Sequence, residues 1–347
     1  MRLQRRSLFA IVLGLVALAT TSALEAREGL VKIFVDETDA RFVLYRLVDV
    51  TKDRYEALFF DQDPRTSSLT LSFDGRQYRL GDSAEFKQAV ARTNGGVSIE
   101  FRSAFARVTE RLDFARSAGA SISDGIRLSI DVENVSQKEA PIGLRLIVDT
   151  DLAEKSGVEF TTPNSSRTSN ETLYEGPAVP AWVATPGEVS SFMLQFVGDG
   201  LSSPDRVHLA NWKRLNEASW ILDASNARNF SLLPYSINDS AIAAYWLPKN
   251  LAAGAKETVT VAMGSYNDKG YPIAQASKGA DELFSKTVLN QSASTDKKTL
   301  IESDLLAVRD LLTRIDLVLS SGSAPSPDEI AAWKKILDLL DQRKKGY

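Results

Sequence analysis

The stretch Gly125–Asn134 reads GIRLSIDVEN, and Ile142–Thr150, shortly after it, reads IGLRLIVDT. In the first stretch every second residue is apolar and the residues between are polar or charged: Ile126, Leu128, Ile130 and Val132 against Arg127, Ser129, Asp131 and Glu133. A period of two predicts a half-buried antiparallel strand. The second stretch is apolar on both faces, so we expect it to lie centrally between two sheets. Together the two stretches predict a body built of β-sheets.

The same period of two dominates from Leu30 to about Met263, with turn residues such as Asp74-Gly75 between several runs. No regular alternation of strands and helices occurs, so the fold class is mainly β, a two-sheet antiparallel supersandwich over residues 27–270. Residues 160–186 are rich in Ser, Thr, Asn and Pro and are interpreted as a long excursion from the sheet, either a crossover or a functional loop. Further strands are predicted at 31–35, 42–48, 57–60, 69–73, 96–101, 104–114, 192–197, 219–222, 241–246 and 257–263.

Beyond a linker at residues 271–296 the period changes to that of a helix. A 4-3-4-3-4 spacing predicts one apolar seam, made of Ile301, Leu305, Val308, Leu312, Ile315 and Leu319. Ser326, Pro327 and Glu329 then form a capping box that starts a second helix. Its predicted apolar face consists of Ile330, Trp333, Leu337 and Leu340. We expect a C-terminal helical hairpin within residues 297–347. It would pack on itself or on the sandwich, or serve as a partner-binding or self-associating module.

The N-terminus has the pattern of a signal peptide over residues 1–26. Three arginines precede the apolar run Leu8–Leu18, which is short for a membrane span, and cleavage is expected after Ala23 or Ala26. The chain has no cysteine, so a lipoprotein and disulfides are excluded, and a bacterial periplasmic or secreted location is expected. No later stretch is apolar enough to insert into a membrane. The net charge of −4 does not indicate a nucleic-acid-binding protein, which would carry an excess of Lys and Arg.

Three acids gather where the central strand ends: Asp149, Asp151 and Glu154. Hard carboxylate oxygens at this spacing could bind Ca²⁺. A carboxylate pair could also perform acid–base chemistry on a sugar. The third interpretation is a solvated strand end with turn-forming aspartates.

A second candidate site combines aromatic rings with polar side chains. Flat rings beside amide and charged groups are typical of a saccharide-binding surface. The alternative is that the tryptophans belong to the core and the polar groups cap a tight turn. The candidate ligand-binding residues are Trp212, Arg214, Tyr235, Asn238, Asp239 and Trp246.

Histidine chemistry is almost excluded. His208 is the only histidine, and the chain lacks a Gly-x-Ser-x-Gly motif and phosphate-binding or dinucleotide-binding glycine patterns. We expect His208 to be structural or exposed. No catalytic residue is predicted, and a non-catalytic protein is favoured over an enzyme.

The succession of residues 125–134 and 142–150 resembles the middle of galactose-mutarotase-like supersandwich domains. Residues 211–246 are similar to a block shared by uncharacterised exported proteins, notably of spirochaetes. The resemblance covers residues 30–265 and implies a supersandwich fold. It also implies an envelope setting such as the cell wall or the periplasmic flagellar assembly. Mutarotases of that fold use paired histidines and a glutamate around the sugar ring, so a chain with His208 alone is not expected to epimerise aldoses.

The leading hypothesis is therefore a non-catalytic periplasmic binding or structural protein. Its sandwich would be a scaffold or glycan-binding surface, and its hairpin would bind a protein partner. The second hypothesis is a carbohydrate-active enzyme or carbohydrate-binding domain that uses the carboxylates and the aromatic surface. The third is a sandwich stabilised by Ca²⁺ at Asp149.

Overall fold

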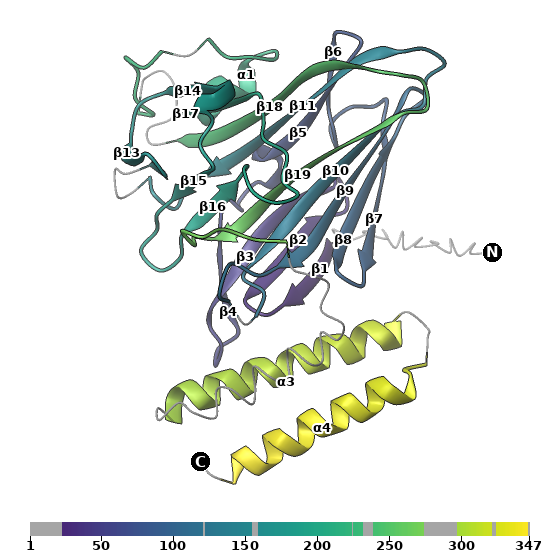
Figure 1. Ribbon diagram of the computed structural model, residues 1–347, viewed down its shortest axis with the longest axis vertical. Coiled ribbons are helices and arrows are strands. Elements are labelled where there is room, and N and C mark those ends of the chain that lie inside the picture. The colour runs from purple at the N-terminus through teal and green to yellow at the C-terminus, as the bar shows by residue number, and fades with distance from the viewer. Residues whose placement is uncertain are drawn as a thin grey trace, which may run out of the picture.

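The computed structural model describes residues 23–120, 122–154, 159–223, 225–231, 239–273, 297–320 and 324–345. Two large antiparallel sheets pack face to face, a smaller N-terminal sheet closes one end of them, and a helical hairpin lies below that sheet (Figure 1). Most of the predicted signal peptide and of the predicted linker lies outside the described residues. The mainly β fold class and the terminal helices are as the sequence predicts.

The larger sheet has nine strands in the described part of the chain. Strands from residues 160–186 form one edge of this sheet, and the three strands that precede Gly125 in the chain form the other edge. In spatial order the strands are β13 (Ser165–Thr168), β12 (Phe160–Thr162), β15 (Trp182–Thr185), β16 (Phe192–Gln195), β19 (Lys256–Ser265), β10 (Gly125–Asn134), β9 (Ala106–Ala115), β8 (Gly96–Arg102) and β7 (Lys87–Thr93).

The second sheet has six described strands and contains the central strand predicted from Ile142–Thr150. In spatial order these are β14 (Thr172–Glu175), β17 (Arg206–Asn211), β18 (Ser240–Leu251), β11 (Ala140–Thr150), β5 (Ser68–Phe73) and β6 (Arg76–Arg79). The N-terminal sheet follows the chain order: β1 (Ala23–Glu28), β2 (Val31–Asp36), β3 (Arg41–Asp49) and β4 (Arg54–Ala57). Short 3₁₀ turns occupy η1 (Pro64–Thr66) and η2 (Gly176–Ala178).

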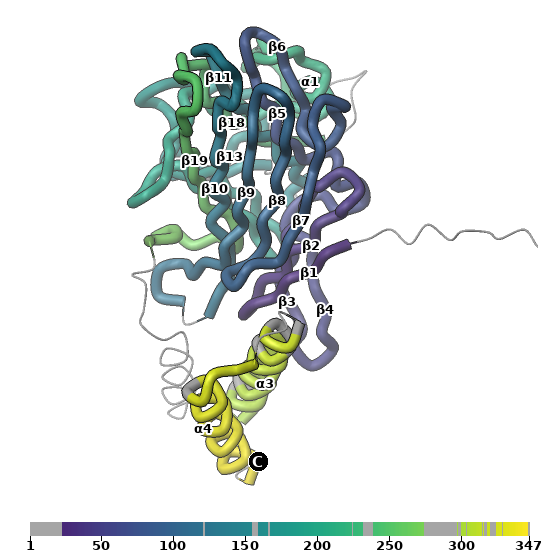
Figure 2. Tube along the Cα trace, turned by 90° about the vertical axis from the view of Figure 1, so that its right-hand side faces the viewer, coloured from purple at the N-terminus to yellow at the C-terminus, as the bar shows by residue number. Residues whose placement is uncertain are grey.

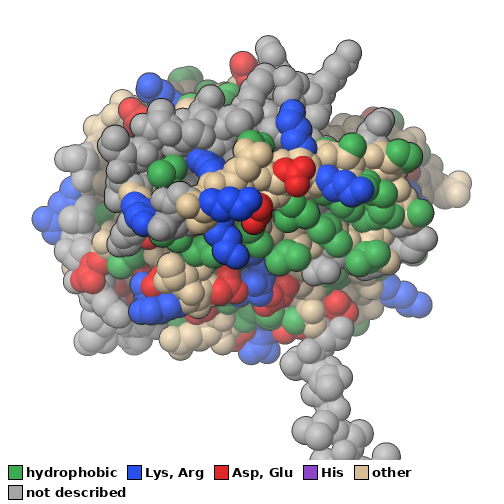
Figure 3. Space-filling model, turned by 90° about the horizontal axis from the view of Figure 1, so that it is seen from below, with side chains coloured by type: hydrophobic (Ala, Val, Ile, Leu, Met, Phe, Trp, Pro, Cys, Tyr) green, Lys and Arg blue, Asp and Glu red, His purple; other side chains and the backbone are tan. Residues whose placement is uncertain are grey.

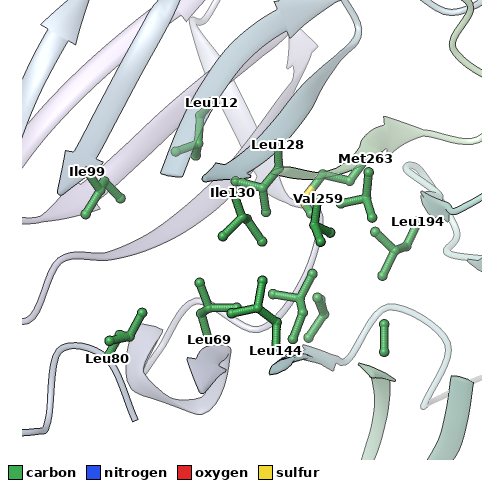
Figure 4. Packing of buried hydrophobic residues seen from close by; sticks show 14 of the residues in the cluster. Leu69, Leu80, Ile99, Leu112, Leu128, Ile130, Leu144, Leu194, Val259 and Met263 are labelled. Carbon is green, nitrogen blue, oxygen red and sulfur yellow. The ribbon is translucent and has the colours of Figure 1, made fainter. Parts of the chain in front are cut away.

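The main core lies between the two large sheets and is formed by the alternating apolar residues. Leu128 and Ile130 of β10 face Leu69 of β5 and Leu144 of β11 across this core (Figure 4). Each such side chain contributes about 1.5–3 kcal/mol when fully buried. The period of two in Gly125–Asn134 is therefore the pattern of a sandwich strand with one face in the core.

Strand β11 is buried on both faces, as predicted, but not because it lies between two sheets. It is an inner strand of the six-stranded sheet, and Leu144 faces the main core. On the other face Ile147 packs with Tyr245 and Leu215 under α1 (Trp212–Glu217) and the residues that follow this helix. The second cover is thus a short helix and an irregular segment.

Other predictions need local correction. Residues 160–186 are not an excursion from the sheet, because their described part contributes β12 and β15 to one sheet and β14 to the other. Residues 219–222 form bends instead of a strand, and β4 ends at Ala57 instead of continuing to Phe60. Strands β1, β6 and β7 were not predicted, because they are short or largely polar and apolar residues do not alternate clearly along them.

The helical hairpin is present as α3 (Lys297–Ser320) and α4 (Pro327–Lys344), and the capping box between Ser326 and Glu329 is formed. Figures 1 and 2 show α3 against the end of the N-terminal sheet and α4 farther from the sandwich. None of the helices in the described part of the chain is long and apolar enough to cross a membrane.

The two helices bury only part of the apolar seam that the sequence predicts. They meet through a small cluster made of Ala307, Leu311, Ile336 and Leu340, with Ile315 and Trp333 packed against it. Leu312 and Leu319 of the predicted seam are 56% and 65% exposed. Seen from below the molecule, hydrophobic side chains gather in a row on the hairpin (Figure 3).

The contact between α3 and the sandwich is polar. The Asp310 carboxylate accepts a hydrogen bond from the Gly29 backbone N–H at 3.2 Å, and Arg309 lies 3.4 Å from the Asp53 carboxylate. Gly29 has a φ of +55°, and a Cβ there would lie 2.4 Å from the Ser123 carbonyl oxygen. A glycine is therefore required at the point where the hairpin docks.

Candidate functional site

An open cavity among the described residues lies at the outer side of the nine-stranded sheet. Its volume is about 610 Å³. Tyr266, directly after β19, and Trp182 and Ala184 of β15 contribute to it, together with the turn between β12 and β13. The described residues that line it are Thr161, Thr162, Pro163, Asn164, Ser165, Trp182, Ala184, Pro186, Ser191 and Tyr266.

The alternation along β15 explains how this cavity is built. Val183 points into the main core, whereas its neighbours Trp182 and Ala184 lie on the outer face beside Met193. A methyl group at Ala184 next to the large indole of Trp182 leaves space on that face. The hollow is therefore a consequence of one small residue beside one large residue on the same side of a strand.

Two aromatic rings meet at the cavity. The ring centroids of Trp182 and Tyr266 are 5.2 Å apart with an interplanar angle of 72°, an edge-to-face pair. The backbone N–H of Tyr266 donates to the Ser191 carbonyl at 3.3 Å, which ties the segment after β19 to the loop before β16. Tyr266 remains 43% exposed, so an aromatic surface is open to solvent.

The rest of the lining carries hydroxyl and amide groups and no charge. Thr161, Asn164 and Ser165 supply donors and acceptors near the rings, and none of the described lining residues is Asp, Glu, His, Lys or Arg. Such a lining can stack apolar faces of a ligand and pair its hydroxyl groups.

The predicted 211–246 surface is not one surface. The Trp212 indole N–H donates to the Thr66 carbonyl at 2.8 Å, and its ring packs against the outer cluster around Tyr245. Trp246 is buried in the main core on the opposite face of β18, with its indole N–H donating to the Ser202 carbonyl at 3.2 Å. Tyr245 and Trp246 are neighbours on β18 and point to opposite faces of the sheet. Trp212 packs on the side of Tyr245, so the sheet separates it from Trp246.

The polar members of that predicted surface are separated as well. Arg214 is buried and paired with Glu171, which is fully buried and also accepts a hydrogen bond from the Ser225 N–H at 3.3 Å. Arg214 is thus occupied by an internal ion pair. Asp239 precedes β18, where its carbonyl accepts from the Trp212 backbone N–H at 3.1 Å. Tyr235 and Asn238 lie outside the described residues.

The predicted calcium ligands lie at the end of β11. Burial raises the pKa of Asp149 to about 8, and the nearby Asp239 and Asp151 carboxylates act in the same direction. Burial likewise raises the pKa of Glu154 to about 8, although its carboxylate accepts from the Ser240 N–H at 2.9 Å. No group of three or more such side chains in the described part of the chain is arranged to hold a metal ion. With the pKa values raised in this way, Asp149 and Glu154 favour their neutral forms at pH 7, and the calcium site stays a prediction.

His208 is fully buried on β17, and neither ring nitrogen has a hydrogen-bond partner among the described residues. Burial lowers its pKa to about 4, and the Arg214 charge contributes in the same direction. The imidazole is therefore neutral at pH 7 and inaccessible to a substrate. The sequence left a structural and an exposed histidine open, and the structure places His208 in the interior.

Glu110 is a buried acid that sequence reasoning passed over. Its position falls on the apolar face of β9, and the side chain lies beside a small internal cavity of about 20 Å³ with Arg41, Phe42 and Phe59. Burial raises its pKa to about 7, whereas the Arg41 charge opposes this effect. The signal in the sequence was a glutamate at a position of β9 where the alternation calls for an apolar residue. A cavity of this size holds about one water molecule, so no larger ligand is implied.

Trp182 and Tyr266 were also missed as site residues. They are far apart in the sequence and meet only because β15 pairs with β16 and β16 with β19. The available signal was a lone tryptophan in a segment rich in Ser, Thr, Asn and Pro, which does not reveal its partner.

No protein-family model and no curated protein matches the chain. Among solved structures, a putative aldose 1-epimerase from Escherichia coli K12 is similar over 71% of this chain and 99% of its own, at 9% identity and a TM-score of 0.42. A galactose mutarotase-like protein from Lactobacillus casei is similar over 71% of this chain and 100% of its own, at 10% identity and a TM-score of 0.40.

One similar structure extends over more of the chain. A TPR-domain containing protein from Parabacteroides distasonis is similar over 92% of this chain and 63% of its own, at 10% identity and a TM-score of 0.47. The candidate site is described from the residues of this chain and not from the residues of these structures.

Proposed function

We propose that this protein is an exported, non-catalytic saccharide-binding protein whose ligand site is the cavity beside Trp182 and Tyr266. The observation that carries the proposal is the composition of that cavity. It joins an exposed tyrosine and a partly buried tryptophan to a rim of hydroxyl and amide groups without a charged residue among its described lining.

The chemistry of the cavity fits a neutral sugar. One face of a pyranose ring is lined by C–H groups and stacks on an aromatic ring, while its hydroxyl groups pair with side chains such as Asn164 and Thr161. A volume of about 610 Å³ is within the range of small-molecule sites and accommodates one or two sugar units. A lining without charge favours neutral saccharides over uronic acids or sugar phosphates.

The placement of the titratable groups supports a binding role over a catalytic one. Asp149, Glu154 and Glu110 have raised pKa values, which is a common property of catalytic acids. None of the three lines the cavity. A glycosidase needs two carboxylates that flank the bond it breaks. The cavity therefore supports recognition and not hydrolysis.

Export to the periplasm or the medium is part of the proposal. The strand β1 begins at Ala23, and Ala26 within it is buried against the core. Signal cleavage after Ala23 keeps nearly the whole strand, whereas cleavage after Ala26 removes most of it. We therefore place the mature N-terminus at Leu24, which the mass of the N-terminal peptide of the exported protein tests. The helical hairpin is proposed to bind a protein partner.

The saccharide proposal is tested with the mature protein on an array of neutral and acidic glycans, followed by calorimetric titration of each glycan that binds. We expect binding to neutral oligosaccharides, at least tenfold weaker binding for Trp182→Leu, and partial recovery for Trp182→Phe, which keeps an aromatic face. Trp333→Leu, in the hairpin, is the matched control and is expected to bind as the parent does. Absence of binding to all neutral glycans, or equal loss in the control, would refute the proposal.

A further inference from the structure

A buried tyrosine lies on the same outer face of the nine-stranded sheet as the cavity, shortly after β19. Tyr271 is 1% exposed, and its ring belongs to one apolar cluster with Ala184 and Met193, against which Trp182 also packs. Ala184 and Trp182 of this cluster line the cavity, whereas Tyr271 is not among the described lining residues. The tyrosine therefore belongs to the packing that supports the cavity from beside it.

The ring of Tyr271 occupies space that two glycines leave free. Gly125 of β10 and Gly264 of β19 are direct partners in the register of the two strands. A Cβ at Gly125 would lie 2.5 Å from Cε1 of Tyr271, and a Cβ at Gly264 would lie 2.4 Å from its hydroxyl oxygen. The three atoms nearest to the added Cβ at Gly125 all belong to the tyrosine side chain. A glycine is therefore required at position 125 by the close approach of this ring.

Hydrogen bonds hold both the side chain and the backbone of Tyr271 in this place. Its hydroxyl donates to the Ser265 carbonyl at 2.8 Å, and the Asp124 carbonyl lies 3.1 Å from the same hydroxyl. Its backbone N–H donates to the side-chain oxygen of Gln195 at 2.7 Å. Gln195 of β16 is the direct partner of Trp182 on β15. The backbone of Tyr271 is thus bound to the residue that lies opposite the cavity tryptophan.

Residues 267–270 join Tyr271 to Tyr266 in a closed turn. The Gly270 N–H donates to the Asn267 carbonyl at 3.0 Å, and the Asn267 side-chain amide donates to the Ala118 carbonyl at 3.2 Å. The Ala118 N–H in turn donates to the Gly270 carbonyl at 2.8 Å. Gly270 has a φ of +66°, a backbone conformation that favours glycine. The backbone from Tyr266 to Tyr271 is therefore held as one unit on the sheet.

We propose that Tyr271 is a positioning residue of the saccharide cavity. It holds Trp182 through the shared apolar cluster and Gln195, and it holds Tyr266 through residues 267–270. The edge-to-face pair of the two rings at 5.2 Å is thereby formed before a ligand binds, so binding does not have to order it. The inference rests on the proposed function for its ligand, whereas the arrangement of the two rings can be measured without one.

The first test is ¹⁹F NMR of the mature protein labelled with 5-fluorotryptophan, without any glycan. Tyr271→Leu removes the ring and the hydroxyl, and we expect it to shift the Trp182 resonance because the neighbouring Tyr266 ring changes its position relative to the indole. Tyr271→Phe keeps the ring in place between the sheet and residues 267–270, so its Trp182 resonance should stay close to that of the parent. The Trp212 resonance should not move in either variant.

Two further variants separate positioning from general loss of packing. Tyr245→Leu is the matched control, because Tyr245 is also a fully buried tyrosine but belongs to the six-stranded sheet. It should lower the thermal stability as Tyr271→Leu does and leave the Trp182 resonance in place. Gly125→Ala places a methyl group against the Tyr271 ring from the side of the sheet and should shift the Trp182 resonance. This variant decides the question if Tyr271→Leu does not fold.

The second test is calorimetric titration with the neutral disaccharides that bind the parent, maltose and cellobiose among those tried. Tyr271→Leu should bind about tenfold more weakly, whereas Tyr271→Phe and Tyr245→Leu should bind within about threefold of the parent. If the parent binds no neutral saccharide, the proposed function fails, and the NMR experiment alone decides whether Tyr271 positions the rings. An unchanged Trp182 resonance in the folded variants, an equal shift in Tyr245→Leu, or parental affinity in a folded Tyr271→Leu would each overturn the inference.

Discussion

Two aromatic regions of the sandwich combine partly buried tryptophans with a tyrosine, and the two tyrosines differ in accessibility. Around β18, Tyr245 is fully buried under α1 and the segment after it, which carry Trp212 and Trp220, and Arg145 donates to the Ala218 and Trp220 carbonyls at 3.0 and 2.8 Å. At β15, Trp182 lies beside Ala184, and Tyr266 is 43% exposed. A helix covers the tyrosine of the first region, whereas the tyrosine of the second is open to solvent. Aromatic composition therefore does not define a binding surface unless the covering segment is known.

Breaking the covered region is expected to give the largest effect on stability. Glu171→Ala leaves Arg214 buried without its ion-pair partner and should lower the free energy of unfolding by about 3–5 kcal/mol. Glu175→Ala is the control, because Glu175 is 52% exposed and its pair with Arg206 is worth less than about 1 kcal/mol. Urea denaturation of both variants at pH 7 measures the difference. Equal losses would show that the Glu171–Arg214 pair does not hold the covering segment.

Replacement of Asp149 is expected to give the next largest effect on stability, and this effect depends on pH. Its pKa is raised to about 8, so between about pH 4 and pH 8 the folded protein keeps a proton that the unfolded chain has released. The free energy of unfolding therefore falls as pH rises through this window. Asp149→Asn should gain roughly 3 kcal/mol at pH 8 and little at pH 4.

Asp131 is the control of opposite sign for that experiment. Burial acts to raise its pKa, but hydrogen bonds from Arg111 and Thr258 outweigh this and lower it. Its stabilising contribution is present above about pH 4 and is lost as pH falls through the lowered pKa, so Asp131→Asn should destabilise the protein at pH 7. Parallel pH profiles of unfolding for the two variants would contradict this interpretation of Asp149.

Substitution of His208 tests whether burial of its imidazole lowers the free energy of unfolding. Both ring nitrogens are buried without partners in the described part of the chain, so His208→Leu should leave the stability unchanged or raise it by about 1 kcal/mol at pH 7. The unfolded chain takes up a proton below about pH 6.5 and the folded protein only near pH 4, so the parent loses stability as pH falls between these values. The gain of the variant should grow from pH 7 to pH 5 in thermal unfolding. A destabilised His208→Leu, with His208→Asn unaffected, would show that the imidazole has an unrecognised partner.

Trp182→Leu is expected to have the smallest effect on stability. The indole lies at an open cavity on the outer face, so its replacement should change the free energy of unfolding by less than about 1 kcal/mol. Urea denaturation beside the glycan titrations measures this. A loss comparable with that of Glu171→Ala would show that Trp182 is a structural residue, which would remove the contrast between the two regions.

The strands and the hairpin could be predicted because their information is local. The alternation in Gly125–Asn134 and the capping box at Ser326 each depend on neighbours within a few residues. The covering of β11 by α1 could not be predicted, since it depends on contacts between distant segments. The same reason hid the Trp182–Tyr266 pair. The seam of α3 was identified as apolar, but its sequence does not state which of its residues the other helix covers.

The most direct test of the central claim is ¹⁹F NMR of the mature protein labelled with 5-fluorotryptophan, which reports on all five tryptophans during titration with a bound glycan. Conservative Trp→Phe variants assign the resonances. The account predicts that the Trp182 resonance shifts while those of Trp212, Trp220 and Trp246 stay in place. A shift of the Trp212 or Trp220 resonance with an unchanged Trp182 resonance would contradict it and return the ligand site to the covered region.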